Sequence, residues 1–413
     1  MPKAILIVCD GLGDLPHPAF RGRTPLQSAR KPNIDRLSSE GINGLLHTVP
    51  RGVIPGSDTA HLSLLGYDPM RYYRGRGPFE ALGAGLKLRE GDVAFRCNFA
   101  TVVEKDGRLI VTDRRAGRIR EQAKELGPAL DGMEIQGIKV IFKPTVEHRA
   151  ALVLRGPGLS CMVSDADPHE GENAPVRESK PLDASKEAAF TAGVVNEFVT
   201  KSFHALDGHP VNAARVKAGL PQANVALPRG AGIYRKPPLF GERFGITAAC
   251  IAGGALYKGV ARFMGIDVVD VPGATGGTDT DVMAKGEAAA RIIGDYDYVL
   301  VHVKGTDNAG HDGDFPGKVG MIERIDEMVG LLLKRVPADT YIAVTGDHTT
   351  SCLKKRHSSE PVPFALRGPG VRVDGVKALD EFSCASGGLG HIDGLFVMPT
   401  ILDLLDKAHV YGS

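Results

Sequence analysis

The chain is poor in the features that mark several large classes of protein. It has no tryptophan and few other aromatic residues, 15 phenylalanines and 9 tyrosines, so a stacking platform for single-stranded nucleic acid is not expected. Its 50 basic and 49 acidic residues nearly cancel, which disfavours a nucleic-acid or membrane-surface partner. The six cysteines are widely spaced and form no Cys-x-x-Cys pair, which disfavours a disulfide framework and a zinc–thiolate site.

Long apolar runs are also missing. No stretch approaches the roughly 18 apolar residues that are needed to span a bilayer. The first residues, MPKAILIVCDG, lack the layout of a signal peptide, because their apolar run is short and ends in an acidic residue. We therefore expect a cytoplasmic protein whose partner is a small molecule, with no nucleic acid and no membrane involved.

The length and the patterning together predict two domains, since 413 residues exceed the usual ceiling for one core. At both ends of the chain, apolar β-type runs alternate with helical patterns, which is typical of an α/β parallel sheet with helices on both faces. The middle of the chain has hairpin-like runs instead, with a turn at Asp106-Gly107. The expected domains are a discontinuous core, residues 1–74 and 245–413, and an inserted, smaller α+β domain, residues 75–244.

Several elements follow from the same patterns. The run AILIVCDG predicts a buried strand, and GSDTAHLSLLG predicts a helix that Ser57 or Asp58 caps. IDVVDVPG also predicts a strand. Further helices are expected around residues 117–126, 185–204 and 317–336.

Seven side chains lie just after apolar β-type runs or one helical turn beyond them, where open α/β sheets present ligand-binding groups. They are Asp10, Ser57, Asp307, His311, Asp347, His348 and His357. Asp307 and His311 are four residues apart, so a helix or turn that begins at TDNAGH brings both to one face. Carboxylate and imidazole ligands without a thiolate suit Mn²⁺, Zn²⁺, Co²⁺ or Mg²⁺. The set predicts a site for two divalent metal ions.

Each of these residues also has a simpler interpretation. Asp10 could bond the backbone amides of the turn that follows it, and a single histidine is more often structural than a ligand. Ser57 could be an ordinary N-cap, a role that is far commoner than that of a nucleophile. The presence of all these residues in one chain favours a functional interpretation. A helix N-terminus suits a phosphate, and a serine that is bound to a metal ion can lose its proton and attack phosphorus.

Anionic substrates need arginine and lysine, because both phosphate and carboxylate carry negative charge. The candidates are Arg114, Arg115, Arg149, Arg229 and Lys258. The simpler interpretation of any one of them is a solvated surface residue. If the two domains close over a cleft, the arginines of the insert and Lys258 of the core could reach one ligand.

The most specific motifs are VCDGLGD, PGSDTAHLSLLGYDP, GRGPFEALGAG, KGTDNAGHDGD, TGDHTT with HSSEPVPF, and GLGHIDGLFVMPTIL. With these motifs the chain resembles, over its whole length, the cofactor-independent phosphoglycerate mutases of the archaeal type, in the alkaline phosphatase superfamily. The resemblance implies an alkaline-phosphatase-like core and an isomerase that interconverts 3-phosphoglycerate and 2-phosphoglycerate in glycolysis and gluconeogenesis. It also implies that 2,3-bisphosphoglycerate is not a cofactor.

The resemblance further implies roles for individual residues. Ser57 would carry a phosphoserine intermediate. One metal ion would be held by Asp307, His311 and His357, and the other by Asp10, Asp347 and His348, with Ser57 as a further ligand. Mn²⁺ is the first expectation, with Zn²⁺, Co²⁺ and Mg²⁺ as alternatives. The insert would grip the substrate and act as a lid, with Arg114, Arg115 and Lys258 as the basic residues carried over.

Some alternatives stay open at this stage. A metal-dependent phosphohydrolase or another phosphomutase on the same core differs only in whether water or the retained alcohol takes the phosphoryl group. A non-catalytic binding protein on the same scaffold is disfavoured, because the nucleophile and the metal ligands are all present. His391 stands in the closing motif where the bacterial pattern of the family has an acidic residue, and it receives no role. A homo-oligomer is compatible with the sequence, which does not fix the oligomeric state.

Overall fold

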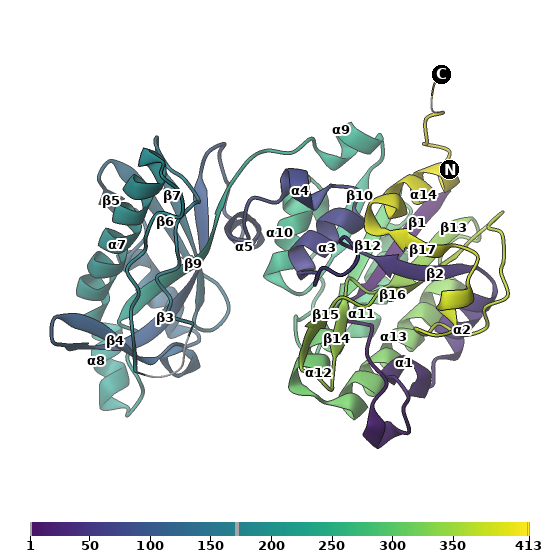
Figure 1. The fold of residues 1–413 in the computed structure, drawn as a ribbon, viewed down its shortest axis with the longest axis horizontal. Coiled ribbons are helices and arrows are strands. Elements are labelled where there is room, and N and C mark those ends of the chain that lie inside the picture. Colours follow the sequence, from purple (N-terminus) through teal and green to yellow (C-terminus); the bar gives the residue numbers. More distant parts are fainter. Residues whose placement is uncertain (1, 170–172, 411, 413) are drawn as a thin grey trace. The chain divides into compact units, whose positions relative to one another are not determined.

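A computed structural model describes residues 2–169, 173–410 and 412. The chain divides into two compact units (Figure 1): a core unit, Met1–Tyr73 with Pro237–Ser413, and an inserted unit, Arg74–Lys236. The core unit resumes at Pro237, before the expected residue 245, because the segment that follows packs into it. There, Phe240 is buried beside Tyr298, and the hydroxyl of Tyr67 donates to the carbonyl of Pro238. Within the described residues, no helix is long and apolar enough to cross a membrane.

The core unit is built on an eight-stranded sheet in the order β11-β10-β12-β1-β13-β16-β2-β17. Its strands are β1 (Lys3–Cys9), β2 (Ile42–His47), β10 (Ala248–Ile251), β11 (Asp267–Val268), β12 (Tyr298–Val303), β13 (Thr340–Thr345), β16 (Val362–Arg367) and β17 (Gly390–Asp393). The central strand β1 is parallel to β12 and to β13. After its first residue, Lys3, β1 is apolar and buried from Ala4 to Cys9, as expected of a strand that is covered on both faces.

One strand of the core sheet departs from the parallel pattern. β16 is antiparallel to both β13 and β2. It follows β13 through a short hairpin, β14 (Thr349–Ser351) and β15 (Arg356–Ser358), and no helix carries the chain back to the start of the sheet. Parallel neighbours need such a crossover, so this one enters in the opposite direction. The α/β class predicted from the sequence is confirmed, with a mixed, mostly parallel sheet.

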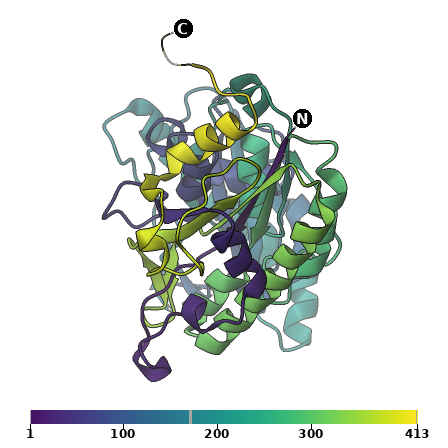
Figure 2. The same cartoon turned by 90° about the vertical axis from the view of Figure 1, so that its right-hand side faces the viewer.

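Helices cover both faces of this sheet (Figure 2). On one face lie α1 (Pro25–Ser28), α2 (Pro32–Ser39), α11 (Val282–Ile292) and α13 (Phe315–Arg335), whose apolar side chains join Ile5 and Ile7 of β1 in one core. On the other face lie α3 (Ser57–Leu64), α10 (Ala255–Phe263) and α14 (Val397–Leu404). Smaller elements complete the unit: α4 (Pro69–Tyr72), α9 (Phe240–Phe244), α12 (Gly305–Asp312), and the 3-10 turns η1 (Pro18–Phe20), η4 (Cys384–Ser386) and η5 (Gly394–Phe396).

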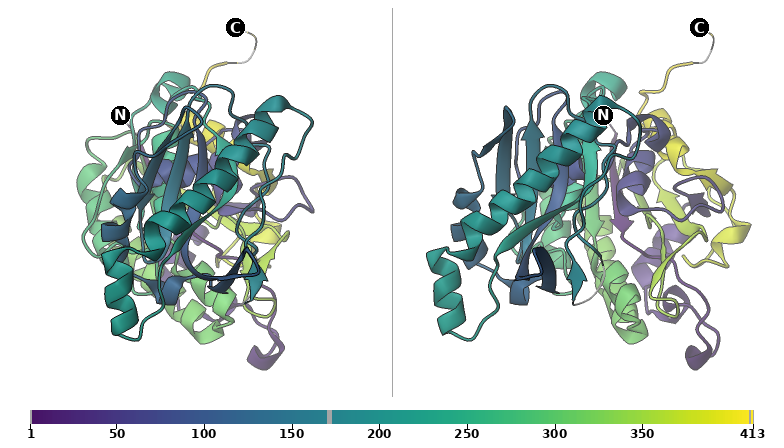
Figure 3. Two further views of the ribbon diagram at one scale, coloured as in Figure 1. Left: turned by 90° about the vertical axis from the view of Figure 1, so that its left-hand side faces the viewer. Right: turned by 60° about the vertical axis from the view of Figure 1, so that its left-hand side comes forward.

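The inserted unit has an antiparallel seven-stranded sheet in the order β5-β6-β7-β3-β4-β8, with β9 also pairing with β3. The strands are β3 (Val93–Lys105), β4 (Arg108–Asp113), β5 (Glu134–Ile135), β6 (Ile138–Pro144), β7 (Arg149–Arg155), β8 (Ala174–Pro175) and β9 (Val225–Ile233). The long helix α7 (Lys186–Asp207) lies across one face (Figure 3), and α5 (Gly77–Gly83) packs on the other. The remaining elements are α6 (Gln122–Leu126), α8 (Pro210–Lys217), η2 (Ala116–Arg118) and η3 (Gly127–Ala129).

Three sequence predictions about elements need correction. Helix α3 is capped by Gly56, and Ser57 is its first helical residue, with no side-chain cap bond. The strand expected in IDVVDVPG is reduced to Asp267–Val268. The helix expected around residues 117–126 covers only Gln122–Leu126, because Gly117 has φ +62° inside a separate 3-10 turn and interrupts the helical backbone.

Candidate functional site

The predicted site residues of the core unit converge beside the carboxyl ends of its central strands. Asp10 directly follows β1, and the pair Asp347 and His348 follows β13. The other residues stand on short neighbouring elements. These are Ser57 on the first turn of α3, Asp307 and His311 on α12, and His357 in β15.

Asp10, Asp347 and His348 form one group of potential ligands. Their ligand atoms all lie within 4.8 Å of one another, and all three residues are buried. The Nε2 atom of His348 lies 3.4 Å from Oδ1 of Asp10 and 3.3 Å from Oδ2 of Asp347. The hydroxyl of Ser57 lies 3.1 Å from the same Nε2 atom, so the serine oxygen borders this group directly.

Asp307, His311 and His357 lie side by side in a second group. Nε2 of His311 is 3.3 Å and Nε2 of His357 is 3.4 Å from Oδ1 of Asp307, and the two ring nitrogens are 3.1 Å apart. His348 stacks on His357 with ring centroids 3.7 Å apart, and its ligand atom falls within 4.8 Å of those of Asp307 and His357. The two groups therefore adjoin at His348.

The donor set fits divalent metal ions. Oδ1 of Asp10 and Oδ2 of Asp347 are buried and have no hydrogen-bond partner among the described residues. Leaving two carboxylate oxygens unpartnered away from water is costly, and a cation at this point would compensate both. The ligands are carboxylate oxygens and imidazole nitrogens, a combination that suits Mn²⁺, Zn²⁺ and Co²⁺, with Mg²⁺ served by the carboxylates.

The buried groups strongly influence one another's protonation. Burial alone would raise the pKa of Asp10, but the ammonium of Lys304 and the His302 ring hold that pKa below its usual range. Burial, together with the charge of Asp10, raises the pKa of Asp347 well above its usual value. Burial lowers the pKa of His348 to about 3, so this ring is neutral at physiological pH and offers a lone pair to a cation.

The structure adds residues that the sequence reasoning did not select. Lys304, at the end of β12, places its ammonium 2.6 Å from Oδ2 of Asp307 and 3.2 Å from Oδ2 of Asp10. Tyr257 of α10 donates its hydroxyl to Asp10 and stacks on His302. Lys304 stands directly before the GTDNAGH motif, so its position after a strand was a usable signal. Tyr257 arrives through the packing of α10 on the sheet, and no sequence motif marks it.

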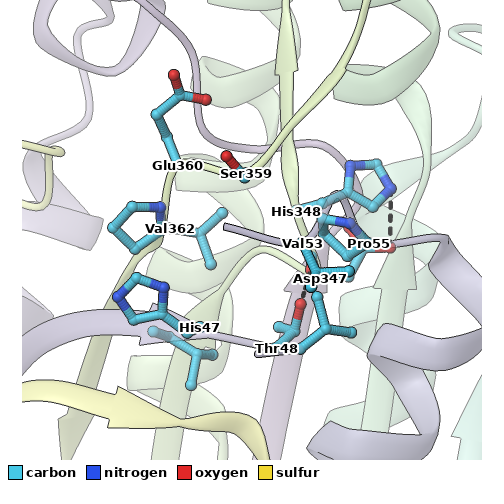
Figure 4. Close-up of a pocket in the computed structure, with 12 residues that line it drawn as sticks. His47, Thr48, Val53, Pro55, Asp347, His348, Ser359, Glu360 and Val362 are labelled. Carbon is cyan, nitrogen blue, oxygen red and sulfur yellow. Dashed lines mark hydrogen bonds and ion pairs between the residues drawn. The ribbon is translucent and has the colours of Figure 1, made fainter. Parts of the chain in front are cut away.

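Second contacts hold the ligand-bearing loops in place. Thr48 donates to the carbonyl oxygen of Asp347 at 2.6 Å, beside His348 (Figure 4). Thr350 donates to Oδ1 of Asp307 at 2.7 Å. The fully buried ammonium of Lys318 on α13 donates to the carbonyls of Gly13 and Thr350 and to Asp14. These bonds tie the loop after β1 to the segment after β13, so their ligands keep one spacing.

The inserted unit has a pocket of about 220 Å³ that is lined by several arginines. They are Arg114, Arg115, Arg118, Arg149 and Arg229. The guanidinium of Arg114 makes two hydrogen bonds to the buried carboxylate of Asp167, at 2.8 and 2.7 Å, and this pair fixes its orientation. Such a concentration of fixed positive charge is suited to an anion that carries phosphate or carboxylate groups.

Lys258 is placed differently from the predicted set. Its ammonium lies 2.6 Å from Oδ1 of Asp270, a side chain that is 73% exposed. Its role in substrate binding stays a prediction, whereas Lys304 is the lysine that contacts Asp10 and Asp307.

Comparison with known proteins identifies the family. A family model described as 2,3-bisphosphoglycerate-independent phosphoglycerate mutase matches residues 38–212. The whole chain is 48% identical to 2,3-bisphosphoglycerate-independent phosphoglycerate mutase 1 of Methanocaldococcus jannaschii and covers 99% of it. It is 50% identical to the corresponding mutase of Methanococcus maripaludis, with complete coverage of both chains. The chain belongs to the 2,3-bisphosphoglycerate-independent phosphoglycerate mutases.

Solved structures agree with membership of this mutase family. A protein from Pyrococcus horikoshii is 38% identical, with a TM-score of 0.86 over 100% of this chain and 99% of that one. The cofactor-independent phosphoglycerate mutase from Thermoplasma acidophilum is 40% identical, with a TM-score of 0.72 over 98% of this chain and 100% of that one. The family predicted from the motifs is confirmed, and with it the enzyme class, an isomerase.

Proposed function

We propose that this mutase interconverts 3-phosphoglycerate and 2-phosphoglycerate through a phosphoserine at Ser57, beside two divalent metal ions, as a step of glycolysis and gluconeogenesis. The observation that carries the proposal is the position of the Ser57 hydroxyl, 3.1 Å from His348 at the border of the buried Asp and His groups. Full-length identity to mutases of this family supports the substrate.

Each of the two clusters of Asp and His side chains is proposed to bind one metal ion. Asp10, Asp347 and His348 would hold one ion, next to Ser57, and Asp307, His311 and His357 would hold the other. Two such ions would lower the pKa of the serine hydroxyl and balance the charge of the transferred phosphoryl group. Mn²⁺ is the first candidate, because carboxylate and imidazole ligands both suit it.

Ser57 is positioned for its part in the transfer. As the first residue of α3 it stands at a helix N-terminus, where the first N–H groups lie outside the helical hydrogen-bond pattern and suit a phosphate, although that of Thr59 donates to Asp58. Its oxygen bonds to phosphorus while the bond from phosphorus to the glycerate oxygen breaks. The glycerate stays bound and reorients, and its second oxygen then takes the phosphoryl group from Ser57. The proton that leaves Ser57 goes to the departing glycerate oxygen, and the proton of the second glycerate hydroxyl returns to Ser57, so the two steps leave the enzyme unchanged.

The chain supplies further charge from Lys304, whose ammonium lies among the carboxylates of both groups. Burial would lower the pKa of Lys304, but the charges of Asp10 and Asp307 raise that pKa above its usual value, so the ammonium stays charged. A fixed cation at this position favours the negative charge that a phosphoryl group brings into the site.

The arginine pocket of the inserted unit is the proposed site for the remaining negative groups of the substrate, with Arg114 and Arg115 among its contacts. Retention of the glycerate is what separates a mutase from a hydrolase, since water must not reach the phosphoserine while the alcohol turns.

Replacing Ser57 with Ala tests the nucleophile. The S57A variant is expected to lose mutase activity by several orders of magnitude while still binding metal, because the carboxylate and imidazole ligands remain but no serine oxygen can accept the phosphoryl group. S63A, which changes another buried serine on the same helix, is the matched control and should retain activity. Turnover by S57A near the wild-type rate would contradict the proposal that Ser57 is the nucleophile. Release of inorganic phosphate by the wild type, as fast as the mutase reaction, would favour a phosphohydrolase.

A further inference from the structure

One residue of the arginine pocket carries no charge and lacks a partner. His148 stands just before β7 and is only 6% exposed, and its Nδ1 atom has no hydrogen-bond partner among the described residues. The nearest carboxylate oxygen, of Glu147, is 3.9 Å away, which is too far for a hydrogen bond. Burial and the charge of Arg149 lower the pKa of His148 to about 4, so the ring is neutral at physiological pH.

The arginines satisfy only part of a phosphoglycerate. A guanidinium group donates five hydrogen bonds and accepts none, which matches phosphate and carboxylate oxygens. The free hydroxyl of the ligand is different, because it also donates a hydrogen bond and therefore needs an acceptor. Without one, the hydroxyl would lose its bond to water on entering the pocket and gain nothing in return.

Few side chains that line the pocket can accept that bond. Asp167 already binds Arg114 through both carboxylate oxygens. Glu147 carries a negative charge, which would repel the phosphate and carboxylate of the same ligand. Asn98 and His148 remain, and His148 is the one whose ring nitrogen is buried without a partner. A neutral imidazole can accept from the hydroxyl with one nitrogen and has no charge that would oppose the anion.

We infer that His148 recognises the free hydroxyl of the phosphoglycerate in the pocket of the inserted unit, and so makes binding specific for a hydroxylated phosphoester. The inference rests on the proposed function, since it takes phosphoglycerate as the ligand. His148 then distinguishes the substrate from organic phosphates that carry the same charges but no hydroxyl.

A ligand comparison tests this role. The S57A background prevents turnover, and the full-length, Mn²⁺-loaded protein is titrated with 3-phosphoglycerate and with 3-phosphooxypropanoate, which lacks the 2-hydroxyl. We expect 3-phosphoglycerate to bind about tenfold more tightly in this background, the value of one neutral hydrogen bond with its desolvation penalty. Adding H148F should bring the ratio of the two dissociation constants close to one and leave the affinity for the analogue essentially unchanged.

Three further variants sharpen the test. H148Q, which keeps an acceptor and a donor, should retain part of the ratio and serves as well if the phenylalanine variant folds poorly. R149M should weaken both ligands and keep their ratio, because it removes charge only. N98A should leave the tenfold ratio in place. If the ratio of the two dissociation constants stays near ten in H148F, or falls to one in N98A, the inference about His148 is wrong. Neither result would affect the proposed function. Failure of the S57A parent to bind 3-phosphoglycerate would overturn the proposed function as well.

Discussion

Charge compensation governs the individual residues of this site. Asp10, Asp307 and Asp347 are buried together, and three carboxylates at such distances repel one another strongly. The structure places the ammonium of Lys304 beside Asp10 and Asp307, and this ammonium also donates to the hydroxyl of Tyr257 at 3.1 Å. Removal of a buried charge from such a cluster leaves its partners uncompensated, and the cost is larger than for a surface pair.

The K304M variant should therefore destabilise the metal-free protein by about 3–5 kcal/mol, the cost of breaking a buried ion pair. K258M is the matched control, because its partner Asp270 has a side chain that is 73% exposed and the pair contributes about 1 kcal/mol or less. Urea denaturation of both variants without metal measures the difference. Equal losses of unfolding free energy would contradict the part given to Lys304.

His148 gives a prediction about pH. The unfolded chain binds a proton at this residue near pH 6.5, whereas the folded protein does so only near its lowered pKa of about 4. Between these values the unfolded state holds more protons, so His148 lowers stability as the pH falls. The H148Q variant should gain stability relative to the wild type as the pH drops from about 7 to about 4. If the difference in unfolding free energy between H148Q and the wild type stayed constant over this pH range, the pKa of His148 would not be lowered in the folded protein.

The elements around the site depend on close backbone approaches. A Cβ atom on Gly310 of α12 would lie 2.6 Å from the carbonyl oxygen of Thr350, the residue whose hydroxyl holds Asp307. Gly310 therefore lets α12 approach β14, and this approach sets where Asp307 and His311 stand. Gly320 of α13 is also inside a helix, but nothing lies within 4 Å of its Cβ position.

The pair G310A and G320A separates packing from helix propensity. G320A should stabilise the protein by about 0.5–1 kcal/mol, because alanine is the better helix former and meets no obstacle. G310A should destabilise it by about 1–3 kcal/mol through overpacking, and it should weaken Mn²⁺ binding by roughly 10–100-fold as α12 moves from its neighbour. Calorimetric titration with Mn²⁺ and thermal unfolding measure the two effects. Unchanged metal affinity in G310A would contradict this account of α12.

Local sequence patterns predicted the elements whose apolar residues recur regularly, such as a strand that is buried on both faces and a helix that is buried along one face. β1 is continuously apolar from Ala4 to Cys9 and α13 has a clear helical period, so both were predicted with nearly their observed bounds. The direction of β16 could not be read in the same way, because it depends on the hairpin β14–β15 and on pairing with β2, which is remote in sequence. The cap of α3 was misplaced for another reason: Gly56 has extended backbone and Ser57 already has helical hydrogen bonding, and both types of residue are common caps.

The residues of the candidate site also divide into those that local sequence patterns predict and those that only the tertiary structure reveals. Asp10, Asp347 and His348 follow the ends of strands, and Asp307 and His311 have the spacing of one helical turn, so their convergence could be expected from sequence. Tyr257 and Lys318 reach the site from helices that pack against it, and only the tertiary structure brings them there. The sequence did not predict precisely which basic residues lie at the site, because the chain has many of them. Fifty lysines and arginines offer many candidates, and charge alone does not separate Lys304 from Lys258.

The two compact units divide the chemistry of the chain. The core unit holds the candidate metal-ligand groups and Ser57, and the inserted unit holds the arginine pocket with His148. In the proposed function both are used, since phosphoryl transfer would call for buried charge and an activated oxygen, and retention of the glycerate would call for a separate hold on its anionic group.

The most direct test of this account is the chemical state of Ser57 during turnover. The Mn²⁺-loaded protein is mixed with 3-phosphoglycerate, quenched in acid within the first turnovers, digested and mapped by mass spectrometry. The account predicts a phosphate on the peptide that contains Ser57, absent without substrate and absent when metal has been stripped. Full mutase turnover with an unmodified Ser57, or with the phosphate on another residue, would contradict it.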